Sequence, residues 1–304
     1  MTSAMADLII YADAGGSKTV ARGICGANGR QFEVRGGACV PSSGIAEALG
    51  SIEGTIAHLI DAAGMTPGRV RIWLALASAG IDDEVSKQSF LTGLAEAVHE
   101  LRLVGDGEAA LMGCVGDRDG AVISVGTGVA AFAKRQGQST FYDGWGWPYG
   151  DRGGGAHIGR EAVAAFLEAT DFDQVGLDPL HDALVNTIGA GRAAIFVWLA
   201  SASRKAAAAL APLVAESAAA GSHAAAGVMA DAAGHIQRLI HAIRPADGGP
   251  VYLTGGAVGL IEPYLQLDTP IEIVPDACLL GARHLAVDWL SNMHRDALRA
   301  SLKQ

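Results

Sequence analysis

The chain has 304 residues, of which 50% are hydrophobic and 18% charged, so it can form one large domain or two ordinary ones with sizeable cores. Its formal net charge of -10 argues against a nucleic-acid-binding surface, where a basic face is expected. Glycine accounts for 41 residues, roughly twice the usual share of about 7%. Because these glycines gather at particular turns without a repeat period, they favour ligand-binding loops.

The cysteines and the N-terminus indicate the compartment. The first six residues lack a basic segment ahead of an apolar stretch, and no run of about 18 apolar residues could span a bilayer. Four cysteines lie far apart, without the close spacing of a metal cluster or a disulfide framework. They are Cys25, Cys39, Cys114 and Cys278. We therefore expect reduced core cysteines in a cytoplasmic protein that does not enter a membrane.

The first predicted strands surround a glycine-rich loop. Residues 8–12, 19–25 and 31–35 predict three strands, and the first two are joined by residues 13–19, DAGGSKT. Adjacent glycines let backbone N–H groups approach an anion, and Asp13 could hold Mg²⁺ through water. An ordinary glycine-rich hairpin turn is the alternative. Because a strand follows, the loop is neither a P-loop nor a Rossmann turn.

A helix and two strands follow in the first half of the chain. Apolar spacing predicts a helix over residues 45–64, a buried strand over 70–76 that runs into the loop 77–80, and a strand over 101–104 that ends at Asp106. An aspartate after a strand is most often a turn or helix-cap residue. This position therefore indicates a function only in the context of other motifs.

The order of the opening elements then recurs. A strand over 121–125, a glycine loop at 126–128 and a strand over 129–134 repeat it about 110 residues later. This duplication predicts two similar α/β domains facing each other, with a boundary near 107–118. Further predicted elements are helices over 160–170 and most of 182–243, strands over 251–254 and 271–274, and a last helical region over 279–302. We expect the last helix to pack on the first domain, because chain ends often meet.

Three glycine loops follow apolar strands, at residues 13–19, 126–128 and 255–256, and Asp106 follows another strand. Ligands of open α/β sheets bind beyond the carboxyl ends of the strands. Together these positions favour a ligand site more strongly than any one of them alone.

Four motifs carry a resemblance to a known family. Residues 13–19 resemble the first phosphate motif of the sugar-kinase and actin-type ATPase superfamily, usually DGGGTKT. Residues 124–128, SVGTG, resemble its second phosphate motif, and residues 254–257, TGGA, its adenosine motif. The segment 144–153, which reads GWG…GDRG, is similar to the GWG…GDEG segment of one kinase branch. The chain thus resembles the BadF/BadG/BcrA/BcrD ATPase family, and within it the N-acetylglucosamine and glucosamine kinases.

The resemblance implies a fold and a domain division. The expected fold class is α/β, with two ribonuclease H-like domains of the actin/hexokinase type and an interdomain cleft. The N-terminal domain is expected over 1–112, joined by the C-terminal helix 286–304. The C-terminal domain, with a helical insertion, is expected over 113–285.

The resemblance also implies an activity with ATP and Mg²⁺ as cofactors: transfer of phosphate from ATP to the 6-hydroxyl of glucosamine or N-acetylglucosamine. Asp106 would be the catalytic base, and Asp13 would hold the metal through water. The β- and γ-phosphates would be bound by Gly15, Gly16, Ser17, Lys18, Thr19, Gly126, Thr127 and Gly128. Gly255 and Gly256 would contact adenosine. The sugar would meet Trp145, Gly146, Asp151 and Ser78.

The motifs depart from the family pattern at three places. Ala14 replaces a usual glycine, and Arg152 stands where the family commonly has an acid, beside Asp151. We hypothesise that Arg152 alters the choice of sugar or pairs with Asp151. The family's asparagine in the sugar loop has no clear counterpart near Val40, which leaves recognition of an N-acetyl group open.

Two other functions remain as alternatives. One is a nucleotide or sugar sensor of the same fold without turnover, which would not need Asp106. The other is the ATPase activator of a 2-hydroxyacyl-CoA dehydratase, which the cysteine spacing disfavours because that activator holds an iron–sulfur cluster through closely placed cysteines. The expected partners are a small-molecule sugar and a second copy of the chain, since dimers are the commonest assembly.

Overall fold

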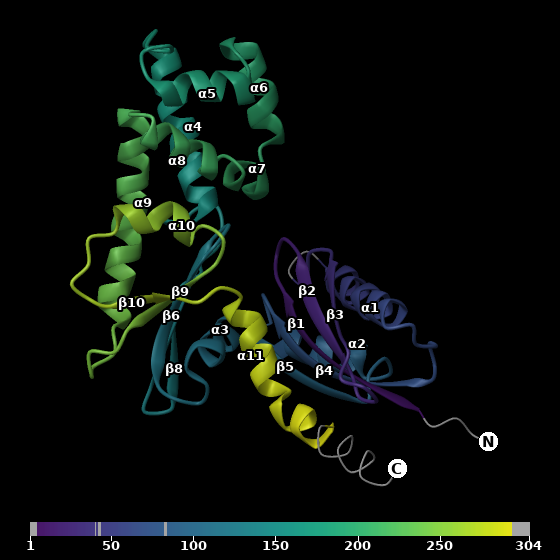
Figure 1. Cartoon of the computed structure of the whole chain (residues 1–304). Coiled ribbons are helices and arrows are strands. Elements are labelled where there is room, and N and C mark those ends of the chain that lie inside the picture. Colours follow the sequence, from purple (N-terminus) through teal and green to yellow (C-terminus); the bar gives the residue numbers. More distant parts are fainter. Residues whose placement is uncertain (1–4, 40, 42–43, 82–83, 294–304) are drawn as a thin grey trace. The chain divides into compact units, whose positions relative to one another are not determined.

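The computed structural model describes residues 5–39, 41, 44–81 and 84–293 (Figure 1). The chain divides into two compact units: unit 1 comprises residues 1–118 and 276–304, and unit 2 comprises residues 119–275. Compared with the expected bounds, unit 1 also contains the end of the helix that follows Asp106 and the whole of the helix that begins at Ala277.

Unit 1 is built on a five-stranded sheet with the order β3-β2-β1-β4-β5. Its strands are β1 (Ala6–Ala14), β2 (Thr19–Cys25), β3 (Gln31–Gly36), β4 (Val70–Ser78) and β5 (Glu100–Gly105). The pairs β1–β2 and β2–β3 are antiparallel, whereas β1–β4 and β4–β5 are parallel. Leu8 and Ile10 belong to one hydrophobic core, and Ile9 and Tyr11 belong to another. Because both faces of the sheet are covered, β1 is apolar without alternation.

Helices cover both faces of this sheet. They are α1 (Ile45–Ala62) and α2 (Glu84–Leu94) with the first core, and α3 (Asp106–Val115) and α11 (Ala277–Leu285) with the second. Helical residues continue over 287–293. The rest of the predicted C-terminal helix, 294–304, lies outside the described residues.

The helices α3 and α11 approach each other closely at two glycines. A Cβ atom at Gly113 would overlap the carbonyl oxygen of Ala277, and one at Gly281 would overlap that of Ala109. Only glycine permits such contact between backbones. The division between the units falls after Arg118, at the end of the expected range 107–118, so α3 lies wholly in unit 1.

Unit 2 repeats the sheet of unit 1, with the order β10-β9-β6-β7-β8. Its strands are β6 (Gly120–Val125), β7 (Val129–Arg135), β8 (Gln138–Asp143), β9 (Val251–Thr254) and β10 (Ile271–Ile273). Strands β6, β7 and β8 pair antiparallel, while β9 is parallel to both β6 and β10. In chain order, the five strands of unit 2 thus take the same positions in their sheet as the five strands of unit 1 take in theirs, so that β6 corresponds to β1 and β10 to β5. The prediction of an α/β chain with two ribonuclease H-like domains is confirmed.

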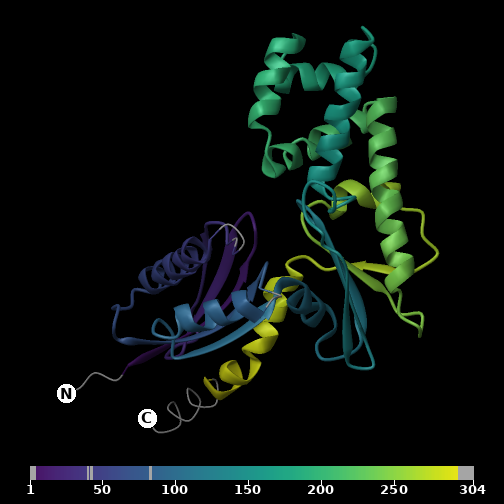
Figure 2. The same cartoon turned by 180° about the vertical axis from the view of Figure 1, so that it is seen from behind.

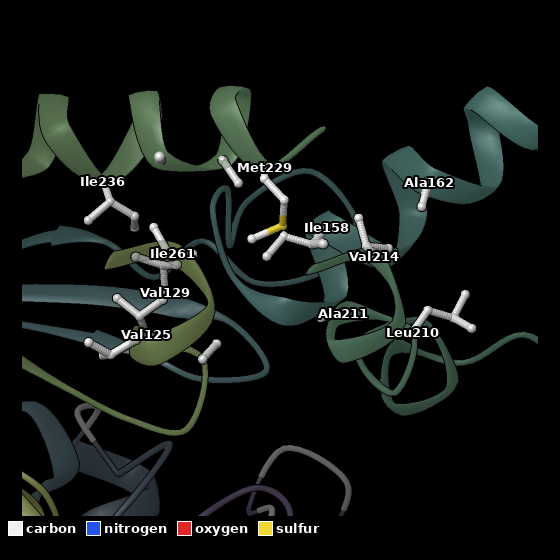
Figure 3. Packing of buried hydrophobic residues seen from close by; sticks show 14 of the residues in the cluster. Val125, Val129, Ile158, Ala162, Leu210, Ala211, Val214, Met229, Ile236 and Ile261 are labelled. Carbon is white, nitrogen blue, oxygen red and sulfur yellow. The ribbon is translucent and has the colours of Figure 1, made fainter. Parts of the chain in front are cut away.

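Helices make up most of the rest of unit 2. They are α4 (Gly155–Asp171), α5 (Pro179–Ile188), α6 (Gly191–Ser201), α7 (Arg204–Ala208), α8 (Ala211–Ala219), α9 (His223–Ile243), α10 (Val258–Ile261) and the 3₁₀ helix η2 (Glu262–Tyr264). In the view from behind, α9 runs along the sheet of unit 2 (Figure 2), where it contacts β6 and β7. In the core, Met229 of α9 lies beside Ile158 of α4 (Figure 3).

Taken singly, the described helices differ from membrane spans in length or hydropathy. No single one of them is long and apolar enough to cross a bilayer. The helices α5 and α6 meet these criteria only together, as a pair bent by 70°.

Candidate active site

The carboxyl ends of three parallel strands meet at one edge of the sheet in unit 1. Ala14 of β1 lies opposite Ser78 of β4, which lies opposite Gly105 of β5. The amide of Ala79 donates a hydrogen bond to the carbonyl of Ala14 at 3.0 Å. The sheet therefore brings together the glycine loop after β1, the loop after β4 and Asp106, which were predicted separately.

The glycine loop is shorter than predicted. Strand β1 continues to Ala14 and β2 begins at Thr19, because these two residues pair directly and Asp13 pairs with Val20. The loop itself is therefore residues 15–18, closed by a 2.9 Å hydrogen bond from the amide of Gly15 to the carbonyl of Lys18. Asp13 belongs to the strand, which fixes its backbone.

Three carboxylates gather at this edge. Burial raises the pKa of Asp13 to about 6, and the negative charges of Asp106 and Asp276 add to the effect while Lys18 opposes it. Asp106 is the first residue of α3, and its Oδ1 accepts a hydrogen bond from the amide of Gly107 at 2.9 Å. Asp276 precedes α11 in a left-handed conformation with φ 54°. Asp276 was not predicted as a site residue, since only the return of α11 to unit 1 brings it here.

This acidic edge suits a divalent cation. Magnesium prefers oxygen ligands and is usually held by one or two carboxylates together with water and phosphate oxygens. The raised pKa of Asp13 means that Lys18 does not offset burial and the two neighbouring carboxylates, so the ionised form is disfavoured in the protein alone. No group of three or more His, Cys, Asp or Glu among the described residues is arranged to hold a metal by itself. The assignment of Asp13 to Mg²⁺ stays a prediction.

Two of the predicted hydroxyl ligands are occupied inside the protein. Thr19 is fully buried and its Oγ1 donates to the carbonyl of Gly37 at 2.9 Å. Ser78 is also fully buried, with Oγ donating to the carbonyl of Ala79 at 3.3 Å and lying 3.6 Å from Sγ of Cys39. Both hydroxyls are thus bound to backbone carbonyls next to the strand ends. A phosphate or sugar could accept a hydrogen bond from them only by displacing those carbonyls.

The other residues predicted for the first phosphate loop are more accessible. Gly16, Ser17 and Lys18 are exposed, and Gly15 is half-buried. Val40, near which an N-acetyl contact was sought, lies outside the described residues. In unit 1, the exposed groups of residues 16–18, including the Ser17 hydroxyl and the Lys18 ammonium, are therefore better placed to meet an anion than the buried hydroxyls.

In unit 2, two glycine loops end neighbouring strands. Ser124 of β6 lies opposite Thr254 of β9, so the predicted phosphate loop 126–128 and adenosine loop 255–256 leave the sheet side by side. Gly255 has φ 106°, and a Cβ there would overlap the carbonyl of Val125. Glycine is therefore required at this position for two reasons, its left-handed backbone and its close approach to the neighbouring strand.

The phosphate loop is a cradle lined by backbone. The amides of Gly155 and Ala156, at the start of α4, donate to the carbonyls of Gly126 and Thr127 at 2.8 and 2.9 Å. A Cβ at Gly154 would lie 2.8 Å from Cα of Gly128, so the loop rests directly on the helix N-terminus. The positive end of the α4 dipole faces the loop, but the two α4 amides are already satisfied by loop carbonyls, and the amide of Gly126 donates to the carbonyl of Gly128 at 2.9 Å. A phosphate at this loop would therefore be met by the backbone N–H groups of Thr127 and Gly128.

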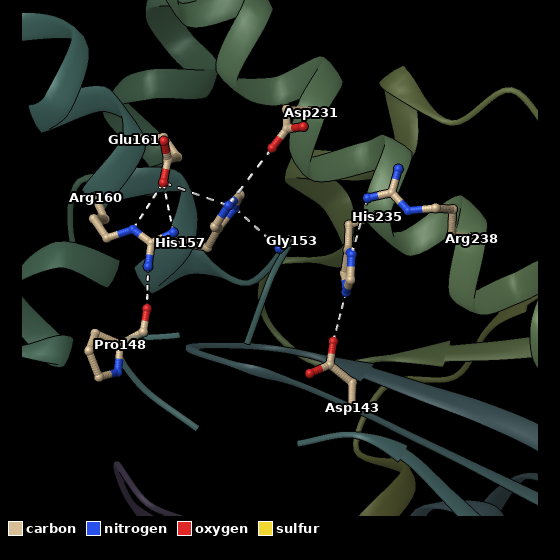
Figure 4. Close-up of polar contacts among 9 residues, drawn as sticks. All are labelled: Asp143, Pro148, Gly153, His157, Arg160, Glu161, Asp231, His235 and Arg238. Atoms are coloured by element: carbon tan, nitrogen blue, oxygen red, sulfur yellow. Dashed lines mark hydrogen bonds and ion pairs between the residues drawn. The ribbon is translucent and has the colours of Figure 1, made fainter. Parts of the chain in front are cut away.

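The segment 143–153 is anchored to two helices (Figure 4). His235 of α9 places Nε2 2.7 Å from Oδ2 of Asp143, and Arg160 of α4 donates to the carbonyl of Pro148. Nδ1 of His157 accepts from the amide of Gly153 at 3.2 Å. Burial is the main cause that lowers the pKa of His157, which keeps the ring neutral and able to accept.

Trp145, within this anchored segment, is 87% exposed. Gly146 follows it with φ 81°. Trp145 is therefore open to a ligand, whereas Gly146 is half-buried and its carbonyl accepts from the amide of Gly150 at 2.7 Å. The contacts of His157 and His235 hold this segment in place, so both histidines act as structural anchors of the loop.

Asp151 does not have the surroundings expected from the sequence. It is 3% exposed with φ 60°, and its Oδ1 accepts from the amide of Val129 at 3.3 Å. Its ion-pair partner is Arg204 of α7, with Nη2 2.8 Å from Oδ2, whereas the neighbouring Arg152 is exposed. The hypothesis that Arg152 pairs with Asp151 is thus corrected. No sequence signal indicated Arg204, which contacts the motif only through the tertiary fold.

Comparison with known proteins agrees with this arrangement. The model of the BadF/BadG/BcrA/BcrD ATPase family matches residues 12–267. A candidate N-acetylglucosamine kinase from Chromobacterium violaceum has a structure with TM-score 0.80 and 27% identity, covering 91% of this chain and 98% of that chain. A ROK family glucokinase from Streptomyces griseus, in complex with glucose and AMPPNP, shares the fold at 16% identity and TM-score 0.51, covering 92% of this chain and 99% of that one.

One curated relative matches over a shorter stretch. The N-acetylmuramic acid/N-acetylglucosamine kinase of Clostridium acetobutylicum is 37% identical over 70 residues, so the match covers 23% of this chain and 23% of that protein. The family model, in contrast, spans most of the chain, from β1 to the segment after β9. The duplicated sheets, the glycine loops at their edges and this match lead to one conclusion: the chain belongs to the BadF/BadG/BcrA/BcrD ATPase family.

Proposed function

We propose that this protein is an ATP-dependent sugar kinase that phosphorylates the 6-hydroxyl of glucosamine or N-acetylglucosamine. The observation that carries the proposal is the meeting of Asp13 and Asp106 at one sheet edge in unit 1, matched by the two glycine loops at the equivalent edge of unit 2. The names of the similar proteins from C. violaceum and C. acetobutylicum support an amino-sugar acceptor.

In this proposal Asp106 is the catalytic base. Its carboxylate would accept the proton of the sugar hydroxyl as the hydroxyl oxygen attacks the terminal phosphorus of ATP. The helix α3 begins at Asp106, and the amide of Gly107 holds its Oδ1, so one carboxylate oxygen is fixed in orientation. Asp13 would hold Mg²⁺ through water, and the metal would neutralise charge on the phosphates.

The glycine loops would bind the nucleotide. Residues 15–18 and 126–128 would cradle the β- and γ-phosphates through backbone N–H groups other than those of Gly15 and Gly126, which donate to the carbonyls of Lys18 and Gly128. Gly255 and Gly256 would let the backbone lie against adenosine. Trp145 would cover one side of the sugar. Asp151 is buried and paired with Arg204, so the predicted contact of its carboxylate with sugar hydroxyls would require it to exchange that partner. The interdomain cleft, the homodimer and the cytoplasmic location stay predictions.

The test is release of ADP from Mg-ATP in the presence of single sugars. Glucosamine, N-acetylglucosamine, N-acetylmuramic acid, glucose and N-acetylmannosamine are compared, with Asp106→Asn as the matched control. Stimulation by one amino sugar, lost in the variant, supports the proposal. If nucleotide binds but no sugar stimulates release, the kinase proposal is rejected in favour of a non-catalytic binding protein.

A further inference from the structure

A buried carboxylate lies directly against the phosphate loop of unit 2. The side chain of Asp151 is 5% exposed, and its Oδ1 accepts from the amide of Val129, the residue that follows the loop. A Cβ at Gly128 would overlap this carboxyl group. The glycine is therefore needed to make room for Asp151, and the carboxylate lies within contact distance of the loop backbone.

This position is unfavourable for an anion-binding loop. A carboxylate buried without a counter-charge would repel phosphate at the loop, because charges interact more strongly in a buried site than in water. Asp151 also adopts φ 60°, a left-handed conformation that aspartate tolerates better than most residues. Retaining Asp151 here thus requires a compensating cation.

Arg204 supplies that cation. It is the first residue of α7, whose start is capped by the hydroxyl of Ser203, which accepts from the amide of Ala206 at 3.1 Å. Its Nη2 lies 2.8 Å from Oδ2 of Asp151, and a Cβ at Gly128 would overlap Nη2 as well. The guanidinium therefore contacts both the carboxylate and the surface of the loop.

Arg204 and Asp151 form an ion pair that lacks the geometry of a hydrogen bond. Oδ2 of Asp151 has no hydrogen-bond partner, although Nη2 of Arg204 is at ion-pair distance. The Arg204 side chain is 45% exposed, so it can adjust when an anion arrives. A bidentate guanidinium is not used here, and a lysine could provide the same neutralisation.

We propose that Arg204 is a positioning residue for nucleotide phosphate: by neutralising Asp151, it allows loop 126–128 to bind the polyphosphate of ATP. This inference rests on the proposed function, because it assigns that loop to phosphate. It adds a residue that none of the phosphate or adenosine motifs contains. In this proposal, the negative charge of Asp151 is compatible with phosphate binding at the loop only while Arg204 is present.

The test measures binding of ATP, ADP and adenosine to the full chain by calorimetry, with Mg²⁺ and without sugar. For Arg204→Gln we expect ATP to bind about 10- to 100-fold more weakly, as for loss of an interaction with a charged group. ADP should weaken less and adenosine should not change. Arg204→Lys should bind ATP within about threefold of the wild type.

The double variant Asp151→Asn with Arg204→Gln identifies the mechanism. Removing both charges should return ATP binding to within about threefold of the wild type, since asparagine can still accept from the amide of Val129. The inference is overturned if Arg204→Gln binds ATP normally, if adenosine weakens equally, or if the double variant stays as weak as the single one. A wild-type chain that binds no ATP rejects the proposed function itself.

Discussion

Replacing Asp13 with asparagine should stabilise the folded protein while weakening the binding of Mg-ATP. The pKa of Asp13 is raised to about 6 from 3.8, chiefly by burial and then by the charges of Asp106 and Asp276. The folded protein therefore binds the proton more tightly than the unfolded chain does. It follows that ionisation of this carboxyl group destabilises the fold, progressively as pH rises from 3.8 to about 6 and fully above that range.

The magnitude follows from the size of the pKa change. A change from 3.8 to about 6 corresponds to about 3 kcal/mol at full ionisation, and to about half of that near pH 5. Asparagine has nearly the same shape and no charge to desolvate. Since it also buries a polar amide, we expect Asp13→Asn to gain about 1–3 kcal/mol near pH 8. For a unit of this size the gain raises the melting temperature by roughly 3–10 °C.

The assay is scanning calorimetry in a chelator, near pH 8 and near pH 5, followed by titration with Mg-ATP. The gain in stability should shrink by about half at the lower pH, and Mg-ATP should stabilise the wild type more than the variant. Glu33→Gln is the control of opposite sign, because the pKa of exposed Glu33 is lowered by its hydrogen bond to Arg22. A variant that is no more stable than the wild type near pH 8, or a gain independent of pH, would refute this reasoning.

Three further predictions test other parts of the structure. Gly281→Val should cost at least about 2 kcal/mol in urea unfolding, because its side chain would overlap the carbonyl of Ala109. The control variant Gly54→Ala, in the open middle of α1, should be neutral or stabilise by up to about 1 kcal/mol. If both variants lost the same free energy of unfolding, the close packing of α3 against α11 at Gly281 would be contradicted. Asp106→Asn should lower turnover by about 10²- to 10⁴-fold with ATP affinity retained, and normal turnover would exclude its role as base. Burial lowers the pKa of His157, so the free energy of unfolding should fall as pH drops below about 6.5, and His157→Gln should reduce that slope; an unchanged slope would count against a neutral buried ring.

Local pattern was sufficient for most of the fold. The apolar runs at 8–12 and 121–125 predicted central strands, and the repeated order of strand, glycine loop and strand predicted two similar sheets. The helix α3 was missed, because residues 107–115 mix glycine, alanine and methionine without a clear helical period. Its partner α11 was predicted as part of the helical region 279–302, but the expected domain bound at residue 285 left it in the second domain, whereas it belongs to unit 1.

The candidate site divides in the same way. Which loops leave the sheets could be read from local sequence, because glycine and strand patterns are properties of short stretches. The same patterns indicated Asp13, Asp106 and the loop 126–128. The tertiary structure alone decided that Asp276 approaches Asp13 and that Arg204 pairs with Asp151. Such pairs are distant in the chain, so their proximity depends on how whole helices pack, and no local pattern records that packing.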